Sequence, residues 1–400
     1  MEIDAIDIRN IILENQDNIA FIIGNGIHYQ YKDCSVSWEK LLESLWLEFI
    51  GEKRSVPNGI STTEFYDVLE MNLYNHSSSS SLPNYVNKLK QTVKMKDLKG
   101  LESQVLAELL VKNSQKTSKV RPVIEVLADE IREQHKKMIS LSREWCDANV
   151  DNASMLSDNE CVSQVMGALS NSTKKQILMG SIKKSVISKF PPKKECNLRE
   201  CINGIRRLNA PILTTNFDTY ISSSVNAIPH IIKPKDTQYR FTDFYPWNMY
   251  YSDRVINNPL DGFAVWHING TQEYSRSIRL GLSDYMGSVE RARKMIQGNN
   301  LNEYFETQKH ESWVGYNTWL HIIFHKSLFI FGLGLEENEV FLRWLLIQRA
   351  KYCRMYNQPL TGWYINKEIK PGKRFFLEQL GFNVIEITNY DTLYQALETL

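Results

Sequence analysis

Four clusters of glycine or polar residues follow apolar runs in this sequence, and their residue types suit the binding of a nucleotide. Glycine turns let backbone N–H groups approach a phosphate, amides and carboxylates bind sugar hydroxyls, and a histidine can move a proton near neutral pH. The clusters are Gly24 to Gly26, Thr214 to Asp218, His267 to Thr271, and Gly332 to Asn338. Together they predict one site for a sugar linked to phosphates.

Each cluster comes at the end of a run that predicts a buried β-strand. The four runs are NIAFIIG (18–24), APILTTNFD (210–218), GFAVWHINGT (262–271) and SLFIFGLGL (327–335), and LTGWYINK (360–367) and FNVIEIT (382–388) predict two further strands. Helical patterns separate several runs, for example at 338–353 and 372–381. The sequence therefore predicts an α/β fold with a Rossmann-like parallel sheet. Ligands of such sheets bind at the carboxyl ends of the strands, where the clusters would meet.

The strand patterns disappear in the middle of the chain. Between residues 64 and 199 amphipathic helical patterns dominate, as in LESQVLAELLVK (101–112). Paired prolines at 191 and 192 then interrupt the helical pattern, because proline cannot continue a helix. We expect residues 1–63 and 200–400 to form one ligand-binding domain of sheet and helices, and residues 64–199 to form a helical insertion subdomain.

Composition and charge exclude several classes of protein. The 400 residues carry 47 basic and 46 acidic side chains, a net charge of +1, so no overall field favours nucleic acid or a membrane surface. No apolar run is long enough to span a bilayer, and the N-terminal residues lack an export signal, so we expect a cytoplasmic protein. Cys196 and Cys201 are the only close cysteine pair, which predicts no metal site.

Each cluster alone also has an ordinary structural explanation. The GNG turn lacks the third glycine of the usual dinucleotide fingerprint, since Tyr29 stands there. Asn216 and Asp218 could cap the next helix, His267 could be a core histidine, and the GLGL segment could be a close backbone contact. One shared site explains four such clusters at four strand ends better than four unrelated turns do.

The order GNG, TTNFD, HINGT and FGLGL resembles the Sir2-like NAD-binding fold, in particular its bacterial antiviral-defence branch. TTNFD is the most specific match, because it is similar to the sirtuin motif in which Asn and Asp meet the nicotinamide ribose. HINGT departs from the pattern. In sirtuins the catalytic histidine directly precedes a glycine, whereas here Asn269 precedes Gly270 and His267 lies two residues earlier.

The resemblance implies NAD as the substrate, with no metal. Protein-deacylating sirtuins carry two cysteine pairs on a zinc module beside their peptide groove, and this chain lacks those pairs. Water, rather than an acyl oxygen, is then the expected nucleophile, and the products are nicotinamide and ADP-ribose. The resemblance implies that Asn216 and His267 are catalytic. It implies NAD contacts for Gly24, Asn25, Gly26, Thr215, Asp218, Asn269, Gly332 and Gly334.

The same resemblance implies a cellular role and partners. The chain would be an NAD-depleting effector of anti-phage defence that forms a homo-oligomer and is restrained by a HerA-type ATPase or another sensor. The alternative is a catalytically silent sensor or scaffold that binds NAD or ADP-ribose, which the displaced histidine favours. A redox enzyme on an ordinary dinucleotide fold fits poorly, because the third glycine of the fingerprint is missing.

Overall fold

The computed structural model describes residues 4–30, 37–76, 143, 157, 182–183, 185–189, 198–232, 246–297, 305–306, 313–358 and 361–400. By its internal contacts the chain divides into two compact units, Met1–Leu73 with Ile182–Leu400, and Tyr74–Ser181. The second unit lies almost wholly outside the described residues, as does most of the helical insertion expected at 64–199.

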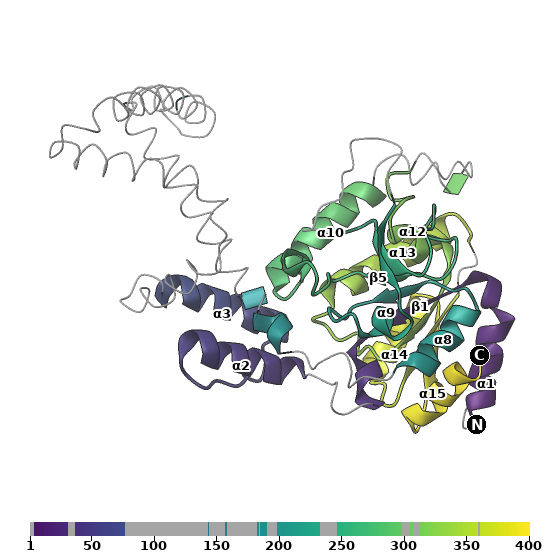
Figure 1. Cartoon of the computed structure of the whole chain (residues 1–400), viewed down its shortest axis with the longest axis horizontal. Coiled ribbons are helices and arrows are strands. Elements are labelled where there is room, and N and C mark those ends of the chain that lie inside the picture. Colours follow the sequence, from purple (N-terminus) through teal and green to yellow (C-terminus); the bar gives the residue numbers. More distant parts are fainter. Residues whose placement is uncertain are drawn as a thin grey trace, which may run out of the picture. The chain divides into compact units, whose positions relative to one another are not determined.

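Eight strands of the described chain form one mixed, mostly parallel sheet in the order β3-β4-β5-β2-β1-β6-β7-β8 (Figure 1). They are β1 (Ile19–Ile23), β2 (Ile212–Thr214), β3 (Ile228–Ile231), β4 (Met249–Ser252), β5 (Val265–His267), β6 (Ser327–Phe331), β7 (Gly362–Asn366) and β8 (Phe382–Glu386). Neighbours from β5 to β8 in this order pair in parallel, and β3 and β4 add antiparallel pairing at one edge. The predicted α/β class with a parallel sheet is confirmed, and β3 and β4 are the strands that the sequence did not predict.

The order of the parallel strands defines where a ligand would bind. Counted along the chain, they lie as 3-2-1-4-5-6 across the sheet, which is the order of doubly wound dinucleotide-binding folds. The winding reverses between β1 and β6, and ligands of such sheets bind outside the strand ends at this point. The GNG loop after β1 and the loop that begins with Gly332 after β6 both start there.

Helices cover both faces of the sheet, because its central strands are apolar on both sides. On β1, Ala20 and Ile22 belong to one core, and Ile19, Phe21 and Ile23 belong to the other. The first core includes residues of α10 (Leu282–Ile296), α12 (Leu320–His325), α13 (Val340–Met355) and α14 (Pro371–Gln379). The second includes residues of α1 (Ala5–Glu14), α8 (Arg199–Arg207), α9 (Tyr220–Ser224) and α15 (Tyr390–Glu398). Figure 1 shows α10, α12 and α13 on one side of the strands and α1, α8 and α15 on the other.

Two further helices, α2 (Trp38–Ile50) and α3 (Thr62–His76), pack against each other through a stacked pair of rings, Trp46 and Phe65, with centroids 5.0 Å apart. Gly51 ends α2 in the left-handed conformation, as its position in the sequence predicts. Short 3-10 helices cover Gln16–Asn18, Asn25–Gln30 and Ser275–Ser277. Within the described ranges no helix is both long and apolar enough to cross a bilayer.

The first residues of α10 contact two segments of the chain, one that comes before residues 74–181 in the sequence and one that comes after them. Before this range, the carboxylate of Asp67 on α3 accepts a hydrogen bond of 3.2 Å from the Ser283 N–H. After it, the buried Nζ of Lys183 forms an ion pair of 3.2 Å with Asp284. Residues that stand before and after 74–181 in the sequence therefore contact two consecutive residues of one helix.

Three glycines bring the loops after β1 and β6 into direct backbone contact. The Gly24 N–H donates to Phe331 O at 3.1 Å, and the Gly26 N–H donates to Gly332 O at 2.7 Å. A Cβ on Gly24 would lie 2.4 Å from Gly332 O, and one on Gly26 would lie 2.7 Å from Gly332 Cα. Gly332 itself has a φ of 64°, which side-chain-bearing residues rarely adopt. The two loops can therefore meet only because these positions lack side chains.

We expect Gly26→Ala to lower the free energy of unfolding by about 1–3 kcal/mol, because the added methyl group overlaps backbone atoms that cannot rotate away. Gly372→Ala is the matched control, since a Cβ there meets no described atom within 4 Å. Urea unfolding of both variants checks the prediction. Equal midpoints for the two variants would show that the loops separate without cost.

Candidate active site

A threonine at the end of β2, Thr214, hydrogen-bonds to the last residue of β1 and also to the turn that follows β2. Thr214 Oγ1 donates to Ile23 O at 3.0 Å and accepts from the Asn216 N–H at 3.1 Å. The Thr215 N–H also donates to Ile23 O, at 3.2 Å. These bonds fix the turn that carries Asn216 beside the loop after β1, where the Asn216 side-chain nitrogen lies 3.4 Å from Gly24 O.

A buried histidine and a buried aspartate pair across the same two loops. His28, in the 3-10 helix after β1, is 1% exposed, and Asp218, after β2, is 2% exposed. His28 Nε2 lies 3.1 Å from Asp218 Oδ2, and Asp218 Oδ1 accepts from the Tyr220 N–H at 3.0 Å. Burial alone would raise the pKa of Asp218, but the charge and hydrogen bond of His28 and the Tyr220 N–H outweigh it and lower that pKa.

The amide of Asn216 competes with Asp218 for the same nitrogen of His28. The Asn216 side-chain nitrogen lies 3.2 Å from His28 Nε2. A ring nitrogen either donates one proton or accepts through one lone pair, so it cannot serve both groups. A carboxylate that is held ionised only accepts, so Nε2 carries the proton and donates to Asp218. The Asn216 amide then keeps hydrogen-bonding capacity for another group.

His267, at the end of β5, is held as a single tautomer by a backbone carbonyl. Its Nδ1 lies 2.8 Å from Asn216 O, and since a carbonyl oxygen only accepts, the proton is on Nδ1. Nε2 then carries the lone pair, and it has no hydrogen-bond partner among the described residues. Burial lowers the pKa of His267, despite opposing effects of the Asn216 carbonyl and the Asp218 charge, so the ring is neutral near pH 7.

Asn269 lies in the same loop as His267 but contacts a different element. Its side-chain nitrogen is 3.4 Å from the hydroxyl of Tyr285 on α10, and its carbonyl accepts from the Arg279 N–H at 3.0 Å. The residue that takes the histidine's position in the sirtuin pattern thus interacts with α10, whereas His267 bonds to the turn after β2.

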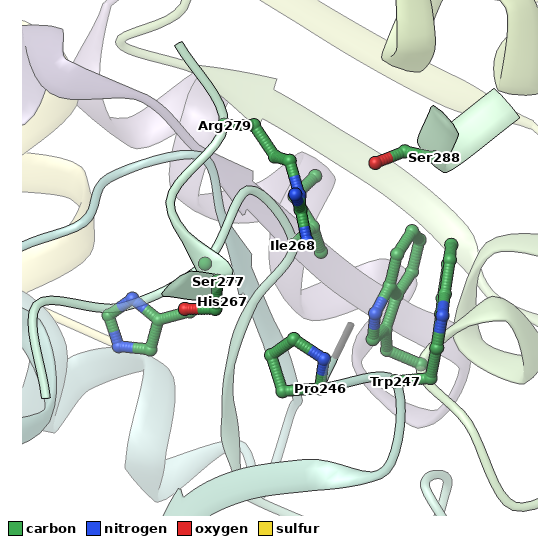
Figure 2. A pocket seen from close by; sticks show the side chains of 9 residues that line it. Pro246, Trp247, His267, Ile268, Ser277, Arg279 and Ser288 are labelled. Carbon is green, nitrogen blue, oxygen red and sulfur yellow. The ribbon is translucent and has the colours of Figure 1, made fainter. Parts of the chain in front are cut away.

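A small cavity lies beside this loop. It is lined by Pro246, Trp247, His267, Ile268, Gly270, Ser277, Arg279, Ser288 and Trp319. Trp247 and Trp319 stack with centroids 5.0 Å apart. Figure 2 shows His267 on the side of the cavity away from Trp247. His267 alone among the predicted site residues belongs to this lining, so the cavity adds Arg279 and two serines to the surroundings of the loop but does not contain the whole predicted site.

Most of the predicted residues are joined by direct contacts. Hydrogen bonds join the turn after β2 to Gly24 and to His267, and the loops of Gly24, Gly26 and Gly332 meet through their backbones. Asn25 begins the 3-10 helix, and Thr215 is buried where β2 ends. The Gly334 carbonyl accepts from Lys373 Nζ at 2.7 Å.

The glycines after β1 do not form the phosphate cradle that the sequence suggested. In such a cradle the N–H groups point at the ligand. Here the N–H groups of Gly24 and Gly26 donate to carbonyls at the end of β6. Their role in the structure is the close packing of two loops.

Sequence reasoning missed His28 as a member of this group. It lies two residues after Gly26, and the fingerprint of a dinucleotide site assigns no role to a histidine there. Its partner Asp218 is 190 residues away in the chain. A histidine two residues after a glycine turn, at the end of a predicted strand, was the available signal. Within the described ranges no three His, Cys, Asp or Glu side chains gather as metal ligands.

A scan of known protein families found none that matches this chain, and a search of curated proteins found no relative. The function is therefore inferred from the chain's own residues.

The lowered pKa of His267 predicts a loss of stability in mild acid. Below about pH 6.5 the unfolded chain binds a proton at this residue that the folded chain does not. The free energy of unfolding therefore decreases as the pH is lowered, by at most about 1.4 kcal/mol per pH unit. The contribution of Asp218 is retained in this range, because its lowered pKa means that it is lost only below about pH 4.

Urea unfolding at pH 7, 6 and 5 checks this prediction. Wild type should lose stability faster than His267→Gln, while His230→Gln, which removes a histidine from β3, should follow wild type. Parallel curves for wild type and His267→Gln would mean that the buried ring takes up its proton as freely as in the unfolded chain.

Proposed function

We propose that this protein is an NAD hydrolase with a Sir2-like site, which splits NAD into nicotinamide and ADP-ribose. The observation that carries the proposal is the state of His267, a neutral imidazole whose Nδ1–H is fixed by Asn216 O and whose Nε2 has no described partner. A base of this kind, bonded to the backbone of the residue that carries the Asn216 amide, suits the activation of water or of a ribose hydroxyl.

The strand order supports a nucleotide as the ligand. The residues around His267 lie at the carboxyl ends of β1, β2 and β5, next to the point where the winding of the sheet reverses. Dinucleotides bind at this point in doubly wound sheets. Fold alone does not define function, so the proposal depends on the chemistry of the side chains there.

The chemistry follows from the charges of the reaction. The bond between C1′ of the ribose and the nicotinamide nitrogen breaks, and its electron pair leaves with nicotinamide, which becomes neutral. Positive charge develops on the sugar, as in glycoside hydrolysis. The oxygen of water bonds to C1′, and its proton passes to Nε2 of His267, directly or through a ribose hydroxyl. The amide of Asn216 orients the water or the ribose hydroxyls, and the ionised Asp218 favours the cationic sugar.

In a cell this reaction would deplete NAD, the role of the antiviral branch that the motifs resemble. One observation favours the alternative of a catalytically silent sensor that binds NAD or ADP-ribose. The His267 ring is only 5% exposed and packs edge-on against Tyr251, with centroids 5.2 Å apart. A hydrolase must open this region to substrate, whereas a sensor needs no access to Nε2.

We expect Asn216→Ala and His267→Ala each to lower NAD turnover by about 100-fold or more, because general base catalysis contributes about 10²–10⁴. The double variant should lose little more than either single one, since residues that act as a unit are not additive. Nicotinamide release measures turnover, and calorimetry of NAD binding separates a loss of chemistry from a loss of binding. His230→Ala is the control.

Asn269→Ala tests whether His267 is the base or whether the site acts by positioning alone, because an amide cannot take up the proton. If it abolishes hydrolysis while His267→Ala leaves it intact, His267 is not the base. NAD binding without any nicotinamide release by the wild-type chain, alone or with its genomic neighbour, would support the sensor instead.

A further inference from the structure

We propose that His28 is a positioning residue of this site, which fixes the tautomer of His267 through Asp218 and the turn of residues 216–218. Only the activity measured below rests on the proposed NAD hydrolysis. The positioning itself is a property of the folded chain and is tested without substrate.

The first step is the bond between His28 and Asp218. His28 Nε2 is 3.1 Å from Asp218 Oδ2, and both side chains are almost completely buried. A buried carboxylate without a donor is costly, so removing the Nε2–H forces Asp218 to move or to take up a proton. His28 is therefore what lets this carboxylate remain ionised in place.

The second step is the hydrogen bond by which the Asp218 carboxylate stabilises the turn that follows β2. Its other oxygen, Oδ1, accepts from the Tyr220 N–H at 3.0 Å, so one carboxylate joins the loop after β1 to the start of α9. Phe217 lies between Asn216 and Asp218, and its carbonyl accepts from the Gln272 N–H at 2.7 Å. We expect the loss of both bonds of the Asp218 carboxylate to shift the backbone of this turn, including the Asn216 carbonyl.

The third step is the carbonyl of Asn216, two residues before Asp218. This oxygen is the acceptor for His267 Nδ1–H at 2.8 Å and so decides which ring nitrogen is protonated. A displaced turn removes that acceptor, and the proton then distributes between Nδ1 and Nε2. The simpler explanation of His28 is packing alone, because its ring lies edge-on to Tyr220 at 5.4 Å.

Two substitutions separate positioning from packing. In His28→Gln the side-chain nitrogen replaces Nε2, so a donor to Asp218 is retained. In His28→Asn the amide is shorter and replaces Nδ1, so that donor is lost while the residue remains polar. Both variants lose the contact of the ring with Tyr220 to a similar extent. Asp218→Asn tests the same link from its other end, with His28 intact.

The readout is long-range ¹H–¹⁵N NMR of the imidazole rings. The chain has eight histidines, and His267→Gln identifies the signal of His267 by its absence. Wild type should show a single Nδ1–H tautomer at His267, His28→Gln should retain it, and His28→Asn and Asp218→Asn should show a mixture. His230→Gln is the control and should match wild type.

Turnover provides a second readout, since the loss of a hydrogen bond to a charged group typically costs about 10- to 100-fold. We expect a loss of that size in kcat for His28→Asn, little change in KM, and partial recovery in His28→Gln. A single Nδ1–H tautomer at His267 in folded His28→Asn overturns the inference. If His28→Asn does not fold, an unchanged tautomer in Asp218→Asn overturns it equally. Absence of hydrolysis in wild type would contradict the proposed function but not the positioning.

Discussion

The candidate site depends on the register of three parallel strands. Ile23, Thr214 and His267, the last residues of β1, β2 and β5, are paired side by side across the sheet. Because parallel strands point the same way, the chain leaves all three at one edge and at one level. Gly24 and Asn269, which are almost 250 positions apart in the sequence, therefore both follow strands that end at this edge. A shift of one residue in any of these strands would turn its last side chain to the opposite face of the sheet.

Burial then limits what the polar groups at this edge can do. A buried polar group needs a partner, and the acceptor or donor that it finds determines its protonation. The carboxylate of Asp218 assigns the proton of His28 to Nε2, and the carbonyl of Asn216 assigns the proton of His267 to Nδ1. Each ring is left with one nitrogen that has no partner among the described residues. Buried polar groups in folded proteins usually have a partner, so each of these nitrogens requires an explanation, of which a role in catalysis is one.

The sequence predicts the parts of this structure that have a strong local pattern. All six parallel strands were predicted and are found, and β1 and β6 have the strongest signal because all five residues of each strand are buried. β3 and β4 were missed because β3 is largely exposed, contains Pro229 and lacks an apolar run. The contact of His28 with Asp218 has no local pattern, since it depends on the register of two strands. The GNG turn shows a different limit, because a glycine signals that a side chain is not tolerated and does not tell whether a ligand or a loop takes its place.

The beginning of α10 has a consequence for how such a chain can change over evolution. Asp67 on α3 and Lys183 stand on either side of residues 74–181 in the sequence, and they contact Ser283 and Asp284, two consecutive residues of α10. β1 comes before Asp67 in the sequence, and β2 and β5 come after Lys183. A change in the length of chain between Asp67 and Lys183 is therefore compatible with an unchanged register of these strands, so this is the place where the chain can gain or lose residues at least cost to the candidate site.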